Sequence, residues 1–161
     1  MIIYLDSSAI VKRYIEENGS EVIEEIYNKT LIGDATIAFS LWNIGEVLGA
    51  LDRYHRRKWI SKEEHTSART QFIAETLKLI KLGRIKLVPV KTRILLESYR
   101  LIEEHHIYQA DALQIATSKF ANTNIFLTAD ESLINIAKKE NIQAYNPEKD
   151  QDKILKILRR A

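Results

Sequence analysis

The chain has 161 residues, of which 45% are hydrophobic and 29% are charged, and its formal net charge is +2. This composition excludes a disordered or collagen-like protein, and the absence of cysteine excludes a disulfide framework and a thiolate zinc site. No apolar run approaches the ~18 residues of a membrane span, and Met1–Leu5 lacks the basic leader of a signal peptide. We therefore expect a single domain over residues 1–161 of a cytoplasmic protein. The balanced charge does not by itself indicate a nucleic-acid-binding protein.

Short apolar runs alternate along the chain with longer segments of helical periodicity. The runs typical of strands lie at 2–5, 35–39, 86–90, 125–127 and 142–145. Helices are predicted at 8–16, 20–29, 41–58, 61–82, 92–105, 111–121, 131–139 and 153–160. Ser40 and Ser61 are candidate helix caps, and Glu64 completes a capping box with Ser61. The alternation favours an α/β fold with a mostly parallel sheet, to which the helix at 61–82 is an extra element.

Two acidic residues follow predicted strands. Asp6 comes directly after 2–5, and Asp130 follows 125–127 after two intervening residues. Ligands in open α/β sheets bind beyond the carboxyl ends of the strands, so both positions suit functional acids. The alternative is structural: Asp6, Ser7 or Ser8 caps the next helix, and Asp130 is a first-turn residue behind a capping box of Thr128 and Glu131.

Two further acids lie on predicted helices. Asp111 opens the helix at 111–121, where an acid is also favoured by the helix dipole. Glu46 is in the middle of the helix at 41–58. That helix has an expected apolar stripe of Leu41, Ile44, Leu48 and Leu51, and an opposite face of Trp42, Gly45, Glu46, Gly49 and Arg53. The Glu46 face is either solvated or packs closely against a ligand, a helix or a second chain, because glycine costs about 1 kcal/mol inside a helix.

Acids gathered at one edge of a parallel sheet repel one another, and without a cation some of them would take up protons. A hard divalent cation such as Mg²⁺ or Mn²⁺ resolves the repulsion, because it prefers oxygen ligands and keeps several waters. Such a site suits phosphodiester hydrolysis, in which the metal activates water and stabilises charge on the phosphate. Helix N-termini at Ser8, Asp111 and Glu131 would add N–H groups that face phosphate oxygens.

Four segments together resemble a known family. They are Asp6-Ser7-Ser8-Ala9-Ile10-Val11-Lys12-Arg13-Tyr14, Leu41-Trp42-Asn43-Ile44-Gly45-Glu46-Val47, Asp111-Ala112-Leu113-Gln114-Ile115-Ala116 and Leu127-Thr128-Ala129-Asp130. In this order they resemble PIN-domain nucleases, particularly the VapC toxins of VapBC toxin–antitoxin pairs. The resemblance runs from Met1 to about Tyr145. It implies a three-layer α/β/α fold with a parallel sheet.

The resemblance also implies a site and its partners. It makes Asp6, Glu46, Asp111 and Asp130 a catalytic metal site for Mg²⁺ or Mn²⁺, in which Asp130 binds directly or through water. Ser7 or Ser8, and Thr128, match hydroxyl positions that orient the acids. The implied activity is cleavage of RNA, and the implied partners are a second copy of the chain and an antitoxin protein. The chain is longer than most such toxins, and the surplus lies around 61–82.

Basic residues near the acids are candidate RNA contacts. Arg53 lies on the Glu46 side of its helix, about 10 Å further along, and Arg57 and Arg13 are further candidates. Each is alternatively an ordinary surface residue, or part of a basic helix end. None of the four histidines has the spacing of a zinc pair. The competing functions are a housekeeping RNA-processing or DNA nuclease of the same fold, and an inactive binding module.

Overall fold

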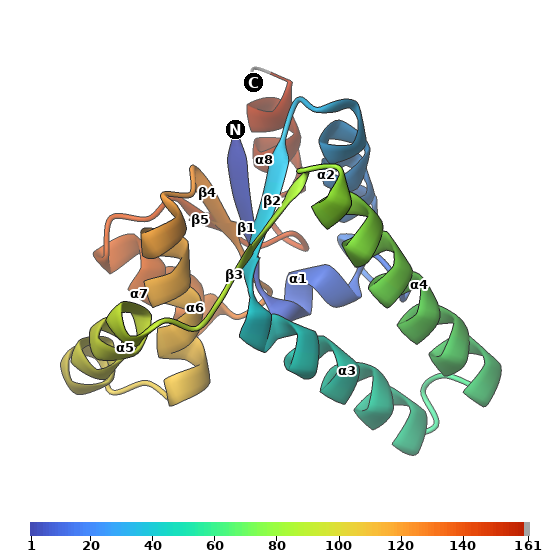
Figure 1. Ribbon diagram of the computed structural model, residues 1–161, viewed down its shortest axis with the longest axis horizontal. Helices are drawn as coiled ribbons and strands as arrows, with labels where there is room; N and C mark the ends of the chain where they lie inside the picture. Colours follow the sequence, from blue (N-terminus) through green and yellow to red (C-terminus); the bar gives the residue numbers. More distant parts are fainter. Residues whose placement is uncertain (160–161) are drawn as a thin grey trace.

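The computed structural model describes residues 1–159, which form a parallel sheet between two layers of helices (Figure 1). The strands are β1 (Ile2–Leu5), β2 (Thr36–Ser40), β3 (Ile85–Val88), β4 (Ile125–Leu127) and β5 (Ala144–Tyr145). The helices are α1 (Ser7–Val11), α2 (Ser20–Ile32), α3 (Leu41–Arg56), α4 (Lys62–Lys81), α5 (Thr92–His105), α6 (Gln109–Ala121), α7 (Glu131–Lys139) and α8 (Gln151–Leu158). The order across the sheet is β3-β2-β1-β4-β5, and every pairing is parallel. The α/β fold expected from the sequence is confirmed.

The central strand β1 is buried on both faces, as its apolar sequence requires. Ile3 and Leu5 point into a core formed with α1, α2, α3, α4 and α8, whereas Tyr4 points into a second core formed with α5, α6 and α7. Figure 1 shows α5, α6 and α7 on one side of the sheet and α2 and α4 on the other. The Tyr4 ring stacks on Phe126 of β4, with ring centroids 5.2 Å apart. Both layers therefore rest on the alternation of side chains along the strands.

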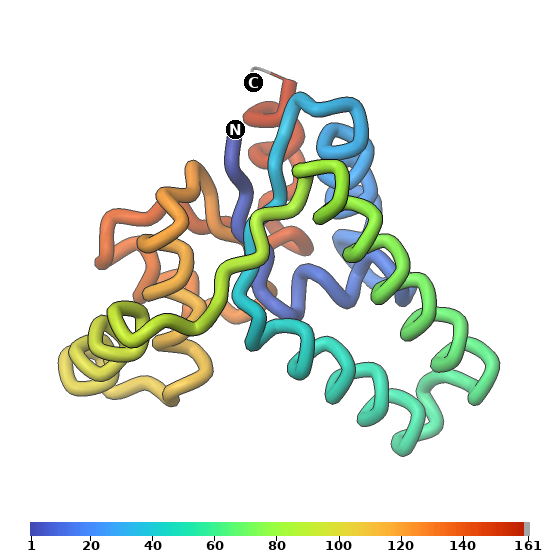
Figure 2. The backbone as a smooth tube through the Cα atoms, viewed as in Figure 1, coloured from blue at the N-terminus to red at the C-terminus, as the bar shows by residue number. Residues whose placement is uncertain are grey.

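The helix expected at 61–82 lies in the connection from β2 to β3. In Figure 2, α3 leads away from the carboxyl end of β2, and α4 returns to the start of β3. The capping box of Ser61 and Glu64 is present. Ala68, Phe72 and Leu79 are buried in the first core, so α4 is part of the packed fold and not an appendage to it.

Several helices differ from their predicted bounds by a few residues, and α1 and α3 differ in ways that affect the acids. The helix expected at 8–16 ends at Val11. In α3 the expected apolar stripe is wrong at Leu41, which is 51% exposed, and the buried residues are Asn43, Val47, Ala50 and Leu51. The stripe is rotated because the Asn43 side chain turns inward, where it accepts the N–H of Ser40 and completes the cap. This rotation also sets the direction of Glu46.

The turn before α2 packs against the loop that follows β5. Gly19 has a φ of +89°, and a Cβ there would lie 2.6 Å from the carbonyl oxygen of Pro147. Only glycine fits both the positive φ and the close approach. The contact fixes the 146–150 loop, including Glu148, beside the end of α1.

Among the described residues, no helix is both long and apolar enough to span a membrane.

Candidate metal centre

Asp6 lies at the carboxyl end of the central strand and caps α1. Its Oδ1 accepts hydrogen bonds from the Ser8 hydroxyl at 2.6 Å and the Ala9 N–H at 2.8 Å, and its Oδ2 accepts one from the Thr128 hydroxyl at 2.6 Å. The side chain is only 6% exposed. Asp6 therefore caps α1, as the alternative interpretation predicted. The same side chain also links the end of β1 to Thr128, which follows β4.

The charge of Asp6 is balanced between opposing effects. Burial raises its pKa, the hydrogen bonds from Ser8, Thr128 and Ala9 lower it, and the negative charge of Asp130 raises it again, with a net upward shift. Two carboxylate oxygens offer about four acceptor sites, and three are taken. The remaining capacity lies on Oδ2, which accepts a single donor.

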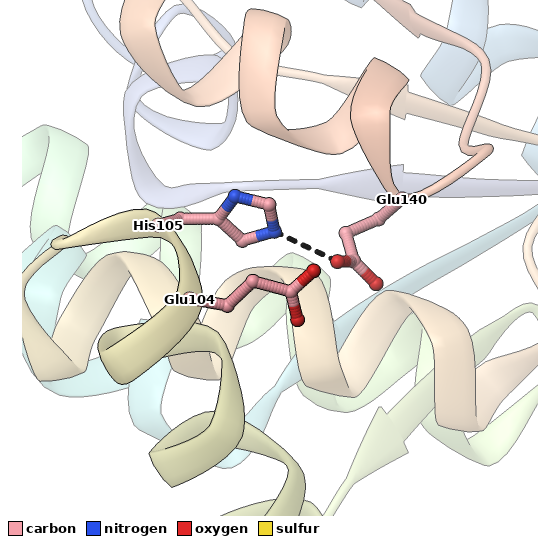
Figure 3. Close-up of side chains that lie close together, drawn as sticks. All are labelled: Glu104, His105 and Glu140. Carbon is pink, nitrogen blue, oxygen red and sulfur yellow. Dashed lines mark hydrogen bonds and ion pairs between the residues drawn. The ribbon is translucent and has the colours of Figure 1, made fainter.

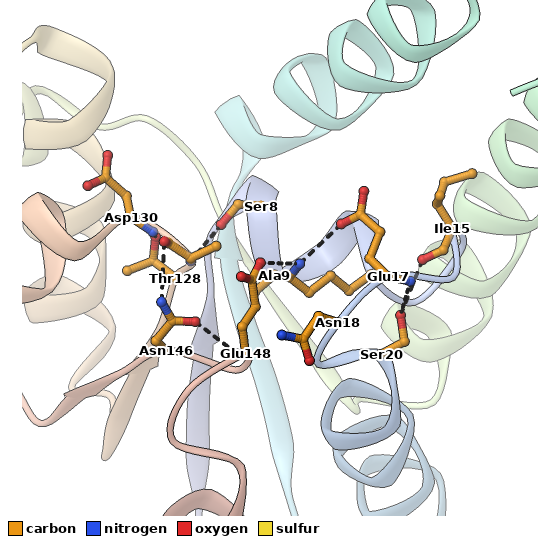
Figure 4. Close-up of polar contacts among 12 residues, drawn as sticks. Ser8, Ala9, Ile15, Glu17, Asn18, Ser20, Thr128, Asp130, Asn146 and Glu148 are labelled. Atoms are coloured by element: carbon orange, nitrogen blue, oxygen red, sulfur yellow. Dashed lines mark hydrogen bonds and ion pairs between the residues drawn. The ribbon is translucent and has the colours of Figure 1, made fainter. Parts of the chain in front are cut away.

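Asp130 is the N-cap of α7, which corrects the expectation of a first-turn residue behind a Thr128–Glu131 capping box. Its Oδ1 accepts the N–H groups of Ser132 and Leu133, at 2.7 and 3.2 Å. Its own N–H donates to the Thr128 hydroxyl at 3.1 Å, so one hydroxyl links Asp6 to Asp130. Figure 4 shows Ser8, Thr128 and Asp130 side by side at this edge. Asp130 takes the cap because it is the last extended residue before the helix.

Glu46 approaches the same edge from α3. Its Oε2 accepts a hydrogen bond of 2.6 Å from the amide nitrogen of Gln114. Burial raises the pKa of Glu46, Trp42 and Ser7 lower it, and the negative charges of Asp6 and Asp111 raise it. Ser7 therefore interacts with Glu46, whereas the Ser8 hydroxyl donates to Asp6.

Asp111 lies in the first turn of α6, which begins two residues earlier than predicted. In the described chain, no hydrogen bond reaches its carboxylate. Burial raises its pKa, and the negative charge of Asp130 raises it further. Asp6 thus interacts with Asp130 and Glu46, and Asp111 interacts with the same two acids. The sequence-predicted acids form one electrostatic cluster.

The donor set of this cluster fits a hard divalent cation. All four side chains offer oxygen only, and two helix caps together with two hydroxyls fix Asp6 and Asp130. Among the described residues, no three of these acids bring an oxygen each within 4.8 Å of one another. Mg²⁺ keeps several of its waters and needs only one or two carboxylates as direct ligands, so this open spacing suits a hydrated ion. The cap N–H groups face carboxylates, which corrects the expectation that those of α1 and α7 face phosphate.

A cleft beside the acids is lined by three basic and three acidic residues. Its lining consists of Ser7, Ser8, Val11, Lys12, Glu17, Glu46, Gly49, Ala50, Arg53, Tyr54, Arg56, Ala129 and Glu148. Lys12 is only 4% exposed. Its ammonium group lies 2.6 Å from Glu148 and 3.1 Å from Glu17, and these carboxylates enter from opposite sides in Figure 4. The cleft leads from Glu46 past Lys12 to Arg53.

The other candidate RNA contacts lie outside this lining. Arg13 donates two hydrogen bonds to Glu75 of α4, at 3.0 and 3.1 Å, and lies over the Tyr27 ring. Arg57 follows α3 and lies over the Trp59 ring. Of the three predicted arginines, the structure brings only Arg53 beside the acids.

Sequence reasoning missed the polar residues behind the acids. Gln114 and Asn43 are 3% and 0% exposed, and they contact each other and Tyr4. The available signal was Gln114 itself, a lone amide in the apolar run of α6 three residues after Asp111. Buried amides need partners, so its position pointed to a polar neighbour.

A second cluster of possible ligand atoms occurs far from these acids. Glu104, His105 and Glu140 bring one such atom each within 4.8 Å of one another (Figure 3). Glu140, however, already pairs with Arg100 at 2.8 Å and Lys119 at 2.6 Å. Burial raises the pKa of Glu140, but the hydrogen bonds from His105, Lys119 and Arg100 lower it to about 2. The cluster is an ion-pair network that joins α5, α6 and the end of α7.

A family model described as PIN domain matches residues 3–139. The chain belongs to the PIN-domain family. The fold of this PIN domain is similar to FitAcB from Neisseria gonorrhoeae (TM-score 0.64, 17% identity, 90% of this chain and 97% of that one). It is also similar to VapBC2 from Rickettsia felis bound to a promoter DNA fragment (0.58, 16%, 91% and 98%). A third similar structure is VapC20 from Mycobacterium tuberculosis, described as a toxin that cleaves the sarcin–ricin loop (0.56, 13%, 77% and 86%). No curated protein matches the chain significantly.

Proposed function

We propose that this PIN domain is an Mg²⁺- or Mn²⁺-dependent endoribonuclease that acts as the toxin of a toxin–antitoxin pair. One observation carries the proposal: Asp6, Glu46 and Asp111 lie close enough to one another or to Asp130 that burial together with a neighbouring negative charge raises the pKa of each of these three acids. A bound divalent ion would activate water and stabilise charge on the scissile phosphate. The family membership and the toxin–antitoxin structures of similar fold support it.

Each acid and hydroxyl of the cluster has its own role in this proposal. Asp6 and Asp111 would hold the ion with Glu46, and Asp130 would complete the site directly or through water. The hydrogen bonds from Ser8 and Thr128 orient Asp6 and lower its pKa against the effect of burial, and Ser7 lowers the pKa of Glu46. A cognate antitoxin would cover the site, and a homodimer is the proposed assembly. Leu41 and Trp42, which are about half exposed beside the cleft, would contribute apolar area to such an interface.

The test is divalent-metal-dependent cleavage of a panel of single-stranded RNAs, hairpin RNAs and DNAs of matched sequence. We expect endonucleolytic cuts in RNA with Mn²⁺ and none with EDTA. Equal cleavage of DNA would favour a nuclease with another role. Failure of the wild type to bind Mn²⁺ at all would contradict the proposal and favour an inactive binding module.

Arg53→Ala is expected to weaken RNA binding, because Arg53 lines the cleft with Glu46 and would bind a phosphate of RNA there. Removing one arginine that binds a phosphate lowers the slope of log Kobs against log salt by about 1. The measurement is RNA binding in EDTA at several salt concentrations, with Arg57→Ala as the control outside the cleft lining. If both variants keep the wild-type slope, Arg53 is an ordinary surface residue.

A further inference from the structure

A chain of buried polar side chains runs from the end of β2 to the Glu46 carboxylate. Tyr4 of β1 and Asn43 of α3 are fully buried, and Gln114 of α6 is 3% exposed. Tyr4 belongs to the second core, together with Ala38, Ala112 and Phe126. Polar groups in such surroundings are costly unless each is paired, so the orientation of every side chain in this chain is restricted by its partners.

The direction of each hydrogen bond in this chain is determined by the one before it. The Ser40 N–H can only donate, and it donates to Asn43 Oδ1 at 3.0 Å. The Asn43 amide nitrogen must then point the other way, and it donates to Gln114 Oε1 at 3.0 Å. The Tyr4 hydroxyl donates to the same Oε1 at 2.8 Å. With its oxygen occupied twice, Gln114 presents its amide nitrogen to Glu46 Oε2 at 2.6 Å.

On both α3 and α6, one buried amide of this hydrogen-bonded chain shares a helix face with one proposed metal ligand. Asn43 and Glu46 are three residues apart on α3, and Asp111 and Gln114 are three residues apart on α6, so each pair shares one helix face. One member of each pair is a proposed metal ligand and the other is a buried amide. The amides meet each other, and one of them meets the ligand on the opposite helix.

We propose that Gln114 is a positioning residue, which holds Oε2 of Glu46 so that Oε1 is directed to the divalent cation. The inference rests on the proposed function, since it assigns Glu46 as a ligand. The Gln114 amide is held by a chain of hydrogen bonds that starts at the Ser40 backbone N–H, so it restricts the Glu46 carboxylate to one orientation. A ligand that is already oriented loses less conformational freedom when the ion binds. Asn43 acts one step further back, by fixing the orientation of Gln114, and Tyr4 only adds a second donor to the same Gln114 oxygen.

The experiment measures Mn²⁺ binding by titration calorimetry for the wild type, Gln114→Met and Tyr4→Phe. Gln114→Met removes the donor to Glu46 with little change in side-chain length, and we expect Mn²⁺ affinity to fall about 10- to 100-fold. Tyr4→Phe is the matched control: it also removes a buried hydrogen bond, but Asn43 still fixes the Gln114 amide, so affinity stays close to wild type. Both variants should unfold at lower temperature, which separates stability from ligand positioning.

The same measurement in the Glu46→Gln background separates positioning from general damage. If Gln114 acts through Glu46, Gln114→Met causes no further loss of Mn²⁺ affinity there. Gln114→Asn, which shortens the amide away from Glu46 but keeps its polarity, replaces Gln114→Met if that variant does not fold. Wild-type affinity in Gln114→Met, or an equal loss in Tyr4→Phe, overturns the inference and leaves the proposed function standing. Absence of Mn²⁺ binding in the wild type instead overturns the proposed function.

Discussion

Asp6→Asn is expected to abolish both Mn²⁺ binding and RNA cleavage while the fold persists. Asparagine is as good an N-cap as aspartate, so α1 keeps its start. A metal that stabilises the transition state by several kcal/mol corresponds to a loss of about a thousandfold or more in rate when its ligand is removed. In EDTA the variant should be at least as stable as the wild type, because burial and Asp130 raise the pKa of Asp6 and make its ionised form costly.

Thermal unfolding with EDTA and with Mn²⁺ measures the binding half of this result without knowledge of the RNA target. At 100 times Kd, Mn²⁺ adds about 2.7 kcal/mol to the wild type, a rise of roughly 5–10 °C for a chain of this length. Asp6→Asn should show no rise. Asp34→Asn is the matched control, since Asp34 is an exposed acid just before β2, at the opposite edge of the sheet. Full RNA cleavage by Asp6→Asn would contradict the assignment of Asp6 to the metal site.

The sheet could be predicted from the sequence because local signals and burial agree there. The apolar runs at 2–5 and 125–127 became β1 and β4 with those bounds, since a strand buried on both faces has few alternatives. The helix face of α3 could not be predicted in the same way. The inward turn of Asn43 depends on Ser40 and Gln114, and Gln114 is 71 residues away in sequence, so no local periodicity contains that information.

The acids of the candidate site could be proposed from their order along the chain, but their surroundings could not. Asp6 and Asp130 follow strands that the topology makes neighbours, and this alone brings them to one edge. The burial of Lys12 depends on Glu148, which is held beside it by the contact of Pro147 with Gly19. The residues around Lys12 do not indicate this burial, because its partner Glu148 lies 136 residues further on.

Glu140→Gln is expected to lower the unfolding temperature at neutral pH without affecting the metal response. Removing one partner of a buried ion pair costs about 3–5 kcal/mol, and solvent screening at the partly exposed Arg100 and Lys119 reduces this to about 2 kcal/mol, or about 4–8 °C. Glu104→Gln is the matched control, because Glu104 is 53% exposed and its ion pair with Arg100 lies at the surface. Its loss should be within about 0.5 kcal/mol.

The pH dependence of the Glu140→Gln effect follows from the lowered pKa. A carboxyl group with a folded-state pKa of about 2 stabilises the fold at every pH above its ordinary range near 4.3, and loses that contribution as the pH falls towards 2. The difference in unfolding temperature between wild type and Glu140→Gln should therefore be constant from pH 7 to about 5 and shrink below about 4. Glu97, whose pKa is also lowered to about 2 by Arg100 and Lys119, shares these two partners with Glu140, so the difference measures Glu140 within this network.

The Mn²⁺ response of this variant decides between the two acidic clusters as metal sites. Glu140 has the closer ligand geometry, with Glu104 and His105, but its oxygens already accept from Arg100, His105 and Lys119. A divalent cation there would have to displace two permanent positive charges. Within residues 1–159, Asp6, Glu46 and Asp111 form no ion pair with a lysine or arginine, and burial together with neighbouring negative charge raises the pKa of each, which a bound cation would oppose. Glu140→Gln should therefore retain the full rise in unfolding temperature with Mn²⁺ that Asp6→Asn loses; the opposite pattern would move the metal site to α5 and α7.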